Sequence, residues 1–344
     1  MSSKVTTEKE QSPVLPYEII VDIVTRVPRC YYPTISLVSK SFQSIIASHE
    51  LYTSRSLLGR TEHYLYAVLY NYNTYDYRLC ILRRKVNNNN HLVIIRSLPC
   101  MPCSVSYVPL GSKIYAVDSS SSLSIDCRSH KVQPNSRIPK HMYEKVPGNI
   151  NGKIYVTENW QVSWDRWGKR VMVLDTETQM TRKPNMEQDQ LWYDAVVMED
   201  KIYMRGSKNS FVYVPKESKW ESDGMLNSKD WENACAVGDL LYYYDVYKNK
   251  LRVYDPKQRC WRVVNGLEKS LPRPNTLLAN MVSYDGKLAM FFHKNVGKGL
   301  ISIWCAEIAL ERRQRGEIWG KVLWYDAVTD DGSFVMVKCL GVTM

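Results

Sequence analysis

A chain of 344 residues is long enough for a small module followed by one large domain. Its hydrophobic content of 44% provides for a buried core, and Tyr (24) and Trp (10) far outnumber Phe (5), which favours half-buried sheet surfaces. The formal net charge is +11, but the basic residues are dispersed, so solvated loops are favoured over a nucleic-acid footprint.

The nine cysteines are dispersed through the chain and odd in number, which argues against a secreted disulfide scaffold. The first fifteen residues hold four charged side chains and no apolar core, so no signal peptide is predicted. No apolar run approaches the ~20 residues that cross a bilayer. These features predict reduced thiols in a protein of the cytoplasm, the nucleus or both, with no membrane association.

The N-terminal part of the chain divides into a polar stretch, residues 1–13, and a predicted helical domain, residues 14–60. The polar stretch is expected to be disordered. Pro16 suits the first position of the first helix and Pro28 ends it. Three shorter helical segments are predicted after it, at 33–38, 39–47 and 48–59. Apolar residues of the first helix that form one stripe at 3.6-residue spacing are Ile19, Ile20, Ile23, Val24 and Val27.

The helical domain is small for the apolar surface that it carries. About 45 residues of short helices bury too little surface to be independently robust. Their apolar stripes are broad, so part of this surface is predicted to bind a partner. Amphipathicity alone leaves open the alternative that the helices form a cap packed on the following domain.

The run from Leu15 to Ile46 resembles an F-box, and the segment from Ser48 to Glu62 resembles the stretch that follows the F-box in plant F-box/kelch-repeat proteins. The resemblance implies that the helical domain binds a Skp-type adaptor and, through it, a cullin scaffold. The residues at the family's apolar positions would contact the adaptor or hold the helices together; they are Leu15, Pro16, Ile19, Ile20, Ile23, Pro28, Leu37, Val38 and Phe42.

From Glu62 onward the helical period gives way to strand-like runs that follow turns containing Gly or Asp. Six copies of the strand-like run, the first of which, at residues 63–66, lacks the turn, recur at intervals of 39 to 49 residues, and a β period of roughly 40 to 50 residues is typical of propeller blades. Two copies also contain a Tyr and a Trp separated by six residues, Tyr213/Trp220 and Tyr254/Trp261, which resembles the kelch motif, in which these aromatics pack between blades. The chain is therefore predicted to be mainly β, with a kelch-like β-propeller of about six blades over residues 61–344.

The ends of the propeller sequence suggest how its ring closes. The first copy has no inner strand of its own, and the last segment, Ser333 to Leu340, is a strand without a blade. We therefore predict that the C-terminal strand completes the first blade and removes an exposed sheet edge. The stretch from Ile303 to Val322 resembles the last blade of plant F-box/kelch proteins and is predicted to form two strands joined by a basic loop.

Residues that could carry chemistry are few. Cys100 and Cys103 have the spacing of a metal or redox pair, but no second Cys or His pair lies near them in sequence. No nucleophile elbow, Walker loop or HExxH motif is present. Asp126, Asp175 and Asp255 recur at the end of a repeated strand, where a carboxylate caps a turn. We therefore predict no catalytic residues, no cofactor and no metal site.

The variable loops of a propeller usually surround one mouth of its central channel, where a target docks. The segment from Trp160 to Lys169 is predicted to be one such loop. Its three tryptophans, Trp160, Trp164 and Trp167, would anchor a protein target or a sugar ring if they are exposed. The alternative is that one or two of them pack between blades.

Together, these patterns and the family resemblance favour the substrate-recognition subunit of an SCF-type cullin-RING ubiquitin ligase. In this interpretation the F-box binds the Skp-type adaptor, the propeller binds a target protein, and catalysis belongs to other subunits. The alternative from another class is a carbohydrate-binding or enzymatic β-propeller with a helical cap. Adaptor binding distinguishes the two.

Overall fold

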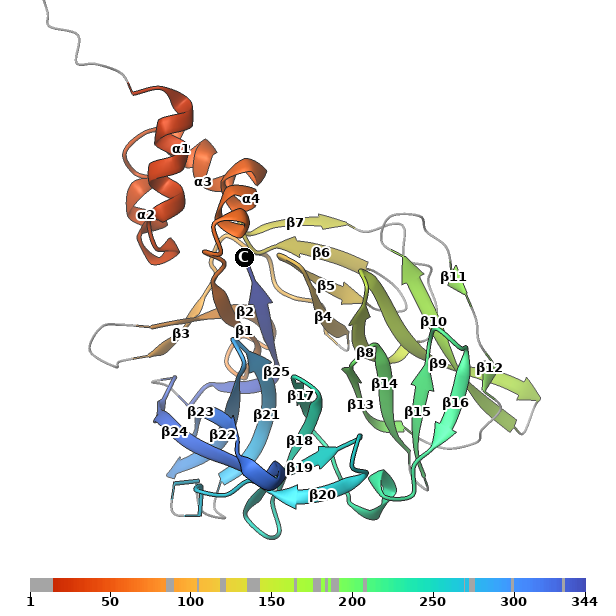
Figure 1. Ribbon diagram of the computed structural model, residues 1–344. Coiled ribbons are helices and arrows are strands. Elements are labelled where there is room, and N and C mark those ends of the chain that lie inside the picture. The colour runs from red at the N-terminus through yellow and green to blue at the C-terminus, as the bar shows by residue number, and fades with distance from the viewer. Residues whose placement is uncertain are drawn as a thin grey trace, which may run out of the picture. The chain divides into compact units, whose positions relative to one another are not determined.

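The computed structural model describes residues 15–344 except 85–89, 104, 118–121, 135–142, 164–165, 176–180, 183–184, 187–191, 207–208, 269, 272–275, 298–299 and 330–331. Residues 1–13, predicted to be disordered, lie outside the described residues. The chain divides into two compact units (Figure 1). The first, the helical unit, comprises the residues up to Glu62 together with Met344, and the second, the β unit, comprises His63–Thr343.

The helical unit follows the local signals of its sequence. Its first helix begins directly after Pro16 and ends before Val27, whose backbone is extended. The hydroxyls of Ser39 and Ser48 accept hydrogen bonds from the N–H groups of Phe42 and Leu51, at 3.3 and 3.2 Å, and so cap the third and fourth helices. The elements are α1 (Tyr17–Arg26), η1 (Arg29–Tyr31), α2 (Tyr32–Ile35), α3 (Lys40–Ala47) and α4 (His49–Leu57). None of the helices among the described residues has the length and apolarity needed to cross a bilayer.

The described strands of the β unit form six antiparallel sheets. The first sheet has the order β25 (Phe334–Thr343), β1 (His63–Asn71), β2 (Asp76–Arg83) and β3 (His91–Ile94). The second has the order β4 (Ser106–Leu110), β5 (Lys113–Val117), β6 (Ser122–Asp126) and β7 (Lys131–Pro134). The third has the order β8 (Tyr143–Ile150), β9 (Lys153–Ser163), β10 (Arg166–Asp175) and β11 (Thr181–Arg182), and β12 (Asn185–Met186) also pairs with β10. The fourth sheet has the order β13 (Trp192–Met198), β14 (Lys201–Gly206), β15 (Ser210–Val214) and β16 (Lys219–Ser222). The fifth has the order β17 (Cys235–Val237), β18 (Leu240–Asp245), β19 (Lys250–Asp255) and β20 (Cys260–Val263). The sixth has the order β21 (Thr276–Tyr284), β22 (Lys287–Gly297), β23 (Leu300–Arg312) and β24 (Ile318–Ala327). Two short 3₁₀ turns, η2 (Leu226–Ser228) and η3 (Gln314–Gly316), lie in connections.

The first strand of each sheet contacts the first strand of the next sheet, in the order β25, β4, β8, β13, β17, β21 and back to β25 (Figure 1). The β unit is therefore a β-propeller, with these strands innermost. The two strands predicted between Ile303 and Val322 are confirmed as β23 and β24, joined by a connection that contains η3.

The strand β25 supplies the innermost strand of the first sheet. It pairs antiparallel with β1 from His63↔Thr343 to Asn71↔Phe334, with a register shift after Val68. In Figure 1, β25 is drawn in blue next to β1, although the two strands come from opposite ends of the β unit. The backbone groups of β1 are therefore paired on both sides, with β2 and with β25.

Aromatic residues pack between neighbouring sheets. Tyr213 and Trp220 are cross-strand partners with ring centroids 4.7 Å apart, and Tyr254 and Trp261 are arranged in the same way at 5.0 Å. Tyr213 belongs to a buried cluster formed with residues of the third sheet, and Tyr254 to one formed with residues of the fourth. The prediction that these aromatics pack between blades is confirmed.

We predict that Gly341→Ala weakens ring closure. A Cβ atom at Gly341 would lie 2.6 Å from the carbonyl oxygen of Ser283 on β21, so β25 would have to move away from its neighbour. The expected loss is about 1–3 kcal/mol in the free energy of unfolding, measured by denaturant titration. Gly224→Ala is the matched control, because a Cβ there meets nothing within 4 Å, and its effect should stay within about 0.5 kcal/mol. Equal stability of the two variants would contradict a tight β21–β25 contact.

We also predict that closure weakens at mildly acidic pH. Nε2 of His293, on β22, accepts a hydrogen bond from the N–H of Met336, on β25, at 3.0 Å, so protonation of Nε2 breaks this bond. Burial lowers the pKa of His293 below its ordinary value of 6.5. The stabilisation is therefore present above about pH 6.5 and is lost as the pH falls below it, by at most about 1.4 kcal/mol per pH unit. Unfolding titrations of the wild type and of His293→Gln should differ in this slope, and superimposable pH profiles would refute the role of His293.

Candidate functional site

The helical unit leaves apolar side chains exposed. Most of the residues predicted to bind the adaptor are among its exposed residues, namely Leu15, Pro16, Ile19, Ile23, Pro28, Leu37 and Val38, whereas Ile20 and Phe42 are half-buried. Leu37 is 85% exposed. We refer to the exposed set of Leu15, Ile19, Ile23, Leu37 and Val38 as the helical apolar surface.

The apolar stripe of α1 divides between two faces. Val24, which the sequence places on the same stripe as Ile19 and Ile23, is buried together with Val21, while Ile19 and Ile23 are exposed. The stripe is thus wider than the face that packs within the unit, and its outer edge lies on the surface. The buried apolar residues of the unit's helices are Val21, Val24, Tyr32, Ile45, Leu51 and Tyr52.

A buried arginine fixes the C-terminal end of α1. The guanidinium of Arg55, on α4, donates hydrogen bonds to the carbonyl oxygens of Thr25 and Val27, at 3.1 and 2.8 Å, and to the hydroxyl of Tyr32 at 3.0 Å. It also forms an ion pair with Glu62. Because these carbonyls lie at the end of α1, Arg55 satisfies groups that the helix leaves unpaired. The orientation of α1, and with it the exposure of its outer face, depends on this contact.

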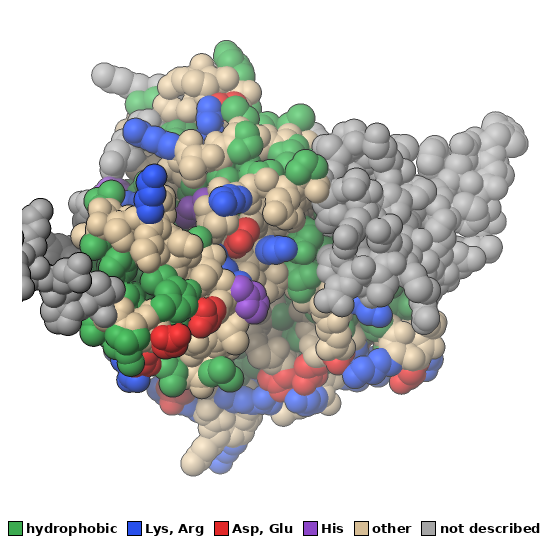
Figure 2. All heavy atoms as spheres, turned by 90° about the horizontal axis from the view of Figure 1, so that it is seen from above, with side chains coloured by type: hydrophobic (Ala, Val, Ile, Leu, Met, Phe, Trp, Pro, Cys, Tyr) green, Lys and Arg blue, Asp and Glu red, His purple; other side chains and the backbone are tan. Residues whose placement is uncertain are grey.

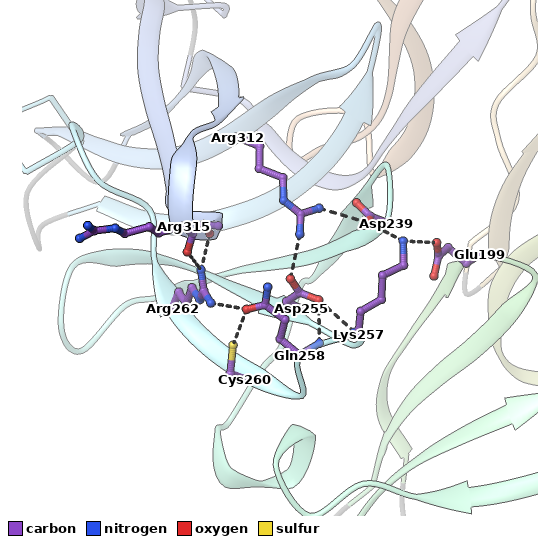
Figure 3. Close-up of polar contacts among 10 residues, drawn as sticks. Glu199, Asp239, Asp255, Lys257, Gln258, Cys260, Arg262, Arg312 and Arg315 are labelled. Carbon is purple, nitrogen blue, oxygen red and sulfur yellow. Dashed lines mark hydrogen bonds and ion pairs between the residues drawn. The ribbon is translucent and has the colours of Figure 1, made fainter.

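In the β unit, an ion-pair network joins three neighbouring sheets (Figure 3). Lys257 pairs with Glu199 at 3.2 Å and with Asp239 at 2.8 Å. Arg312 pairs with Asp239 at 3.3 Å and with Asp255 at 3.1 Å. The hydrogen bond from Lys257 holds the pKa of Asp239 below its ordinary value. Asp239 thus lies between two cations from neighbouring sheets, an arrangement that stabilises the contact between these sheets.

The recurring aspartates cap turns where the structure describes them. Asp126 accepts hydrogen bonds from the N–H of Arg128 and the hydroxyl of Ser129, at 2.9 and 3.2 Å. Asp255 accepts from the N–H groups of Lys257 and Gln258 at 2.9 and 3.1 Å. The turn-capping prediction is confirmed for these two residues. The side chain of the third, Asp175, lies outside the described residues.

The prediction of a long loop from Trp160 to Lys169 was wrong. The strand β9 extends to Ser163 and β10 begins at Arg166, and the two pair from Ser163↔Arg166 onward. Backbone pairing continues through this segment because Trp and Val favour a pleated sheet. Trp160 and Trp167 therefore belong to strands, while their side chains and all of Trp164 lie outside the described residues. A binding role for the three tryptophans stays a prediction.

Cys100 and Cys103 are exposed thiols. The sulfur of Cys100 donates a hydrogen bond to Asp76 at 3.4 Å. Within the part of the chain that the structure describes, no group of three or more His, Cys, Asp and Glu side chains is placed to hold a metal ion.

Charges of both signs lie on the described part of one face of the molecule (Figure 2). Figure 2 shows acidic, basic and apolar side chains interspersed on the face that it draws. This pattern agrees with the dispersed basic residues of the sequence and differs from the single-sign stripe that nucleic-acid binding proteins present.

Comparison with known proteins identifies both units. The family model for the F-box domain matches residues 13–54, and the model described as FKB95, Kelch-repeats domain, matches residues 77–329. The TolB protein of Acinetobacter baumannii has a similar fold, with a TM-score of 0.53 at 10% identity over 89% of this chain and 73% of TolB. The chain is therefore an F-box protein of the class in which a kelch-type propeller follows the F-box.

Two relatives from Arabidopsis thaliana resemble the chain over most of its length. F-box/kelch-repeat protein At4g38940 is 44% identical over 354 residues, which cover 96% of this chain and 94% of the relative. F-box/kelch-repeat protein At4g39240 is 37% identical over 350 residues, which cover 96% and 91%. The chain belongs to the plant F-box/kelch-repeat protein family.

We predict that Arg55→Ala destabilises the F-box locally. The substitution removes the Arg55 donor from the carbonyls of Thr25 and Val27 and the cation that pairs with Glu62, at a cost of about 3 kcal/mol. Hydrogen exchange of the α1 and α4 amides should accelerate accordingly. Arg26→Ala is the control, because its pair with Asp22 is exposed and contributes less than about 0.5 kcal/mol. Unchanged protection in Arg55→Ala would show that α1 is held by other contacts.

Proposed function

We propose that this chain is the substrate-recognition subunit of an SCF-type cullin-RING ubiquitin ligase. The F-box binds a Skp-type adaptor, which links it to a cullin scaffold, and the propeller binds a target protein. Membership of the F-box/kelch-repeat family supports both parts of the proposal. The observation that carries it is the helical apolar surface, because a small unit gains little from apolar side chains that it leaves in water.

The helical apolar surface is large enough to matter energetically. Covering one fully exposed aliphatic side chain contributes about 1.5–3 kcal/mol, and because these five are exposed for about half or more of their surface they offer roughly 5–9 kcal/mol before the costs of association. Those costs are estimated at about 4–15 kcal/mol for lost freedom of movement. Because the gain and the cost are similar in size, the loss of one central side chain is expected to change affinity strongly.

In this proposal the chain contributes proximity and performs no catalytic step. A bound target lysine is held near the activated ubiquitin, which raises its effective concentration. A propeller suits this role because its sheets are joined by buried aromatic clusters and by the network around Lys257 and Arg312. We interpret each of the six described sheets as one blade.

We predict that Leu37→Asp abolishes capture of a Skp-type adaptor. A carboxylate at this site cannot be covered by an apolar partner without a large desolvation cost, so affinity should fall at least a hundredfold. Leu57→Asp is the matched control, because Leu57 is 83% exposed on the same unit and was not among the predicted adaptor-binding residues. Co-purification of the full chain with the adaptor measures both variants.

Two outcomes of this experiment would contradict the proposal. A wild-type chain that binds no Skp-type adaptor, while both units are folded, would favour the carbohydrate-binding or enzymatic propeller with a helical cap. Equal loss of capture in Leu37→Asp and Leu57→Asp would show that the helical apolar surface is not the specific contact. Circular dichroism of each variant controls for unfolding.

A further inference from the structure

Where the structure describes the propeller, its exposed large apolar side chains are concentrated at three turns. Among the described residues of the β unit there are nine, which are Tyr72, Tyr75, Met225, Val246, Tyr247, Val296, Leu300, Leu323 and Val337. Six of the nine lie at the turns that join the second and third strands of the first, fifth and sixth sheets. These six are Tyr72 and Tyr75 between β1 and β2, Val246 and Tyr247 between β18 and β19, and Val296 and Leu300 at the facing ends of β22 and β23.

The three turns belong to neighbouring sheets and meet at one end of the strands. Ser333, in the connection from β24 to β25, accepts hydrogen bonds from the N–H of Tyr72 at 2.9 Å and from the side-chain amide of Asn73 at 2.8 Å. The adjacent Gly332 packs against Leu300, since a Cβ atom at Gly332 would lie 2.4 Å from the Leu300 Cβ. One connection therefore touches the turns of both the first and the sixth sheet.

The turn of the fifth sheet is joined to the same region by aromatic contacts. The ring of Tyr244, near the end of β18, lies 6.0 Å from that of Phe292 on β22. Tyr244 comes just before the turn of the fifth sheet, and Phe292 lies five residues before the end of β22, so the fifth and sixth sheets are in contact below their turns. We refer to the six exposed side chains at these turns as the three-turn surface.

The turns at the opposite end of the strands are different. Those between the first and second strands include Asp200, Asp239 and Asp285, whose backbones or adjacent glycines have positive φ, as tight turns require. Each of these aspartates pairs with a lysine, at 2.9, 2.8 and 3.3 Å. The exposed apolar side chains are thus not a general property of propeller turns in this molecule.

The three-turn surface carries positive charge. Asp76 and Asp245, the acidic residues of its turns, are largely buried and bind Arg78 and Arg252, each through an arginine Nε at 2.8 Å. Hydrogen bonds from Thr74 and Arg78 also hold the pKa of Asp76 below its ordinary value. Lys248 and Lys250 are exposed beside Tyr247 and pair with no acid among the described residues. Lys294 lies over the ring of Trp304 at 4.1 Å.

We propose that the three-turn surface binds the target protein, and that the bound segment of the target combines aromatic or aliphatic anchors with acidic residues. Exposed tyrosines are common anchors of protein interfaces, and lysines beside them favour an acidic partner. Aliphatic Val246, Val296 and Leu300 beside the tyrosines favour a protein partner over a nucleic acid, which binds to aromatic stacking platforms. The proposal rests on the proposed function of the propeller as the target-binding unit.

A phage-displayed library of random peptides, selected on the immobilised full chain, tests this proposal. Enriched peptides should contain aromatic or aliphatic residues next to Asp or Glu. A synthetic peptide from the selection should bind the double variant Tyr75→Ser/Tyr247→Ser at least about tenfold more weakly than the wild type. Lys248→Glu/Lys250→Glu should also weaken binding, and its effect should shrink as salt is raised. Leu323→Ser, at an exposed site on the outer strand β24, is the control and should bind as the wild type does.

Several results would overturn the proposal. These are a selection that yields no binder, enriched peptides without acidic residues, and binding that is insensitive to the tyrosine variant. Binding of a labelled single-stranded oligonucleotide that the same variants weaken would assign the surface to nucleic acid instead. Capture of the Skp-type adaptor, measured on the same preparations, should be unchanged in every variant. If the wild type does not capture the adaptor, the proposed ligase function is contradicted, whereas peptide binding by the three-turn surface is judged by its own measurement.

Discussion

The backbone ladder between β25 and β1 is the interaction on which the rest of the propeller depends. Each innermost strand contacts the next, so the ring is complete only when the last strand of the chain pairs with the first strand of the β unit. The entropic cost of closing so long a loop grows slowly with its length, by about 0.6 kcal/mol per doubling, so a ladder with many backbone bonds can offset it. The same closure builds the three-turn surface, because Ser333 contacts Tyr72 and Asn73 just before β25 begins.

The F-box achieves order in a different way, because it is too small to bury all of its apolar residues. Arg55 replaces part of an apolar core with hydrogen bonds to the end of α1 and an ion pair with Glu62. A polar contact of this kind fixes one side of α1 without covering the other. Ile19 and Ile23 can therefore face outward on a helix whose position is already defined, which lowers the cost of ordering on binding.

Local features of both units could be predicted from the sequence, because short-range chemistry determines them. Ser39 and Ser48 cap helices, Asp126 and Asp255 cap turns, and the Tyr–Trp spacing marks neighbouring strands. The division of the α1 stripe could not be predicted, since a 3.6-residue period does not tell which of two adjacent faces packs inward. The segment beginning at Trp160 was predicted to be a long loop, whereas β9 and β10 pair with each other on both sides of residues 164–165. The three-turn surface has no local signal, because the turn of the first sheet joins those of the fifth and sixth only through ring closure.

The side chains at the two ends of the propeller strands contribute differently to the stability of the fold. At one end, Asp239 binds both Lys257 and Arg312 and so connects neighbouring sheets, which means that a substitution there costs stability. At the other end, Tyr247 is 96% exposed, and a surface substitution of this kind changes stability by about 0.5 kcal/mol or less. At the first end, the residues are therefore constrained by the contacts between sheets that they make. The second leaves its side chains exposed, so under the proposed target-binding role a change of target would require no change in the contacts that hold the sheets together.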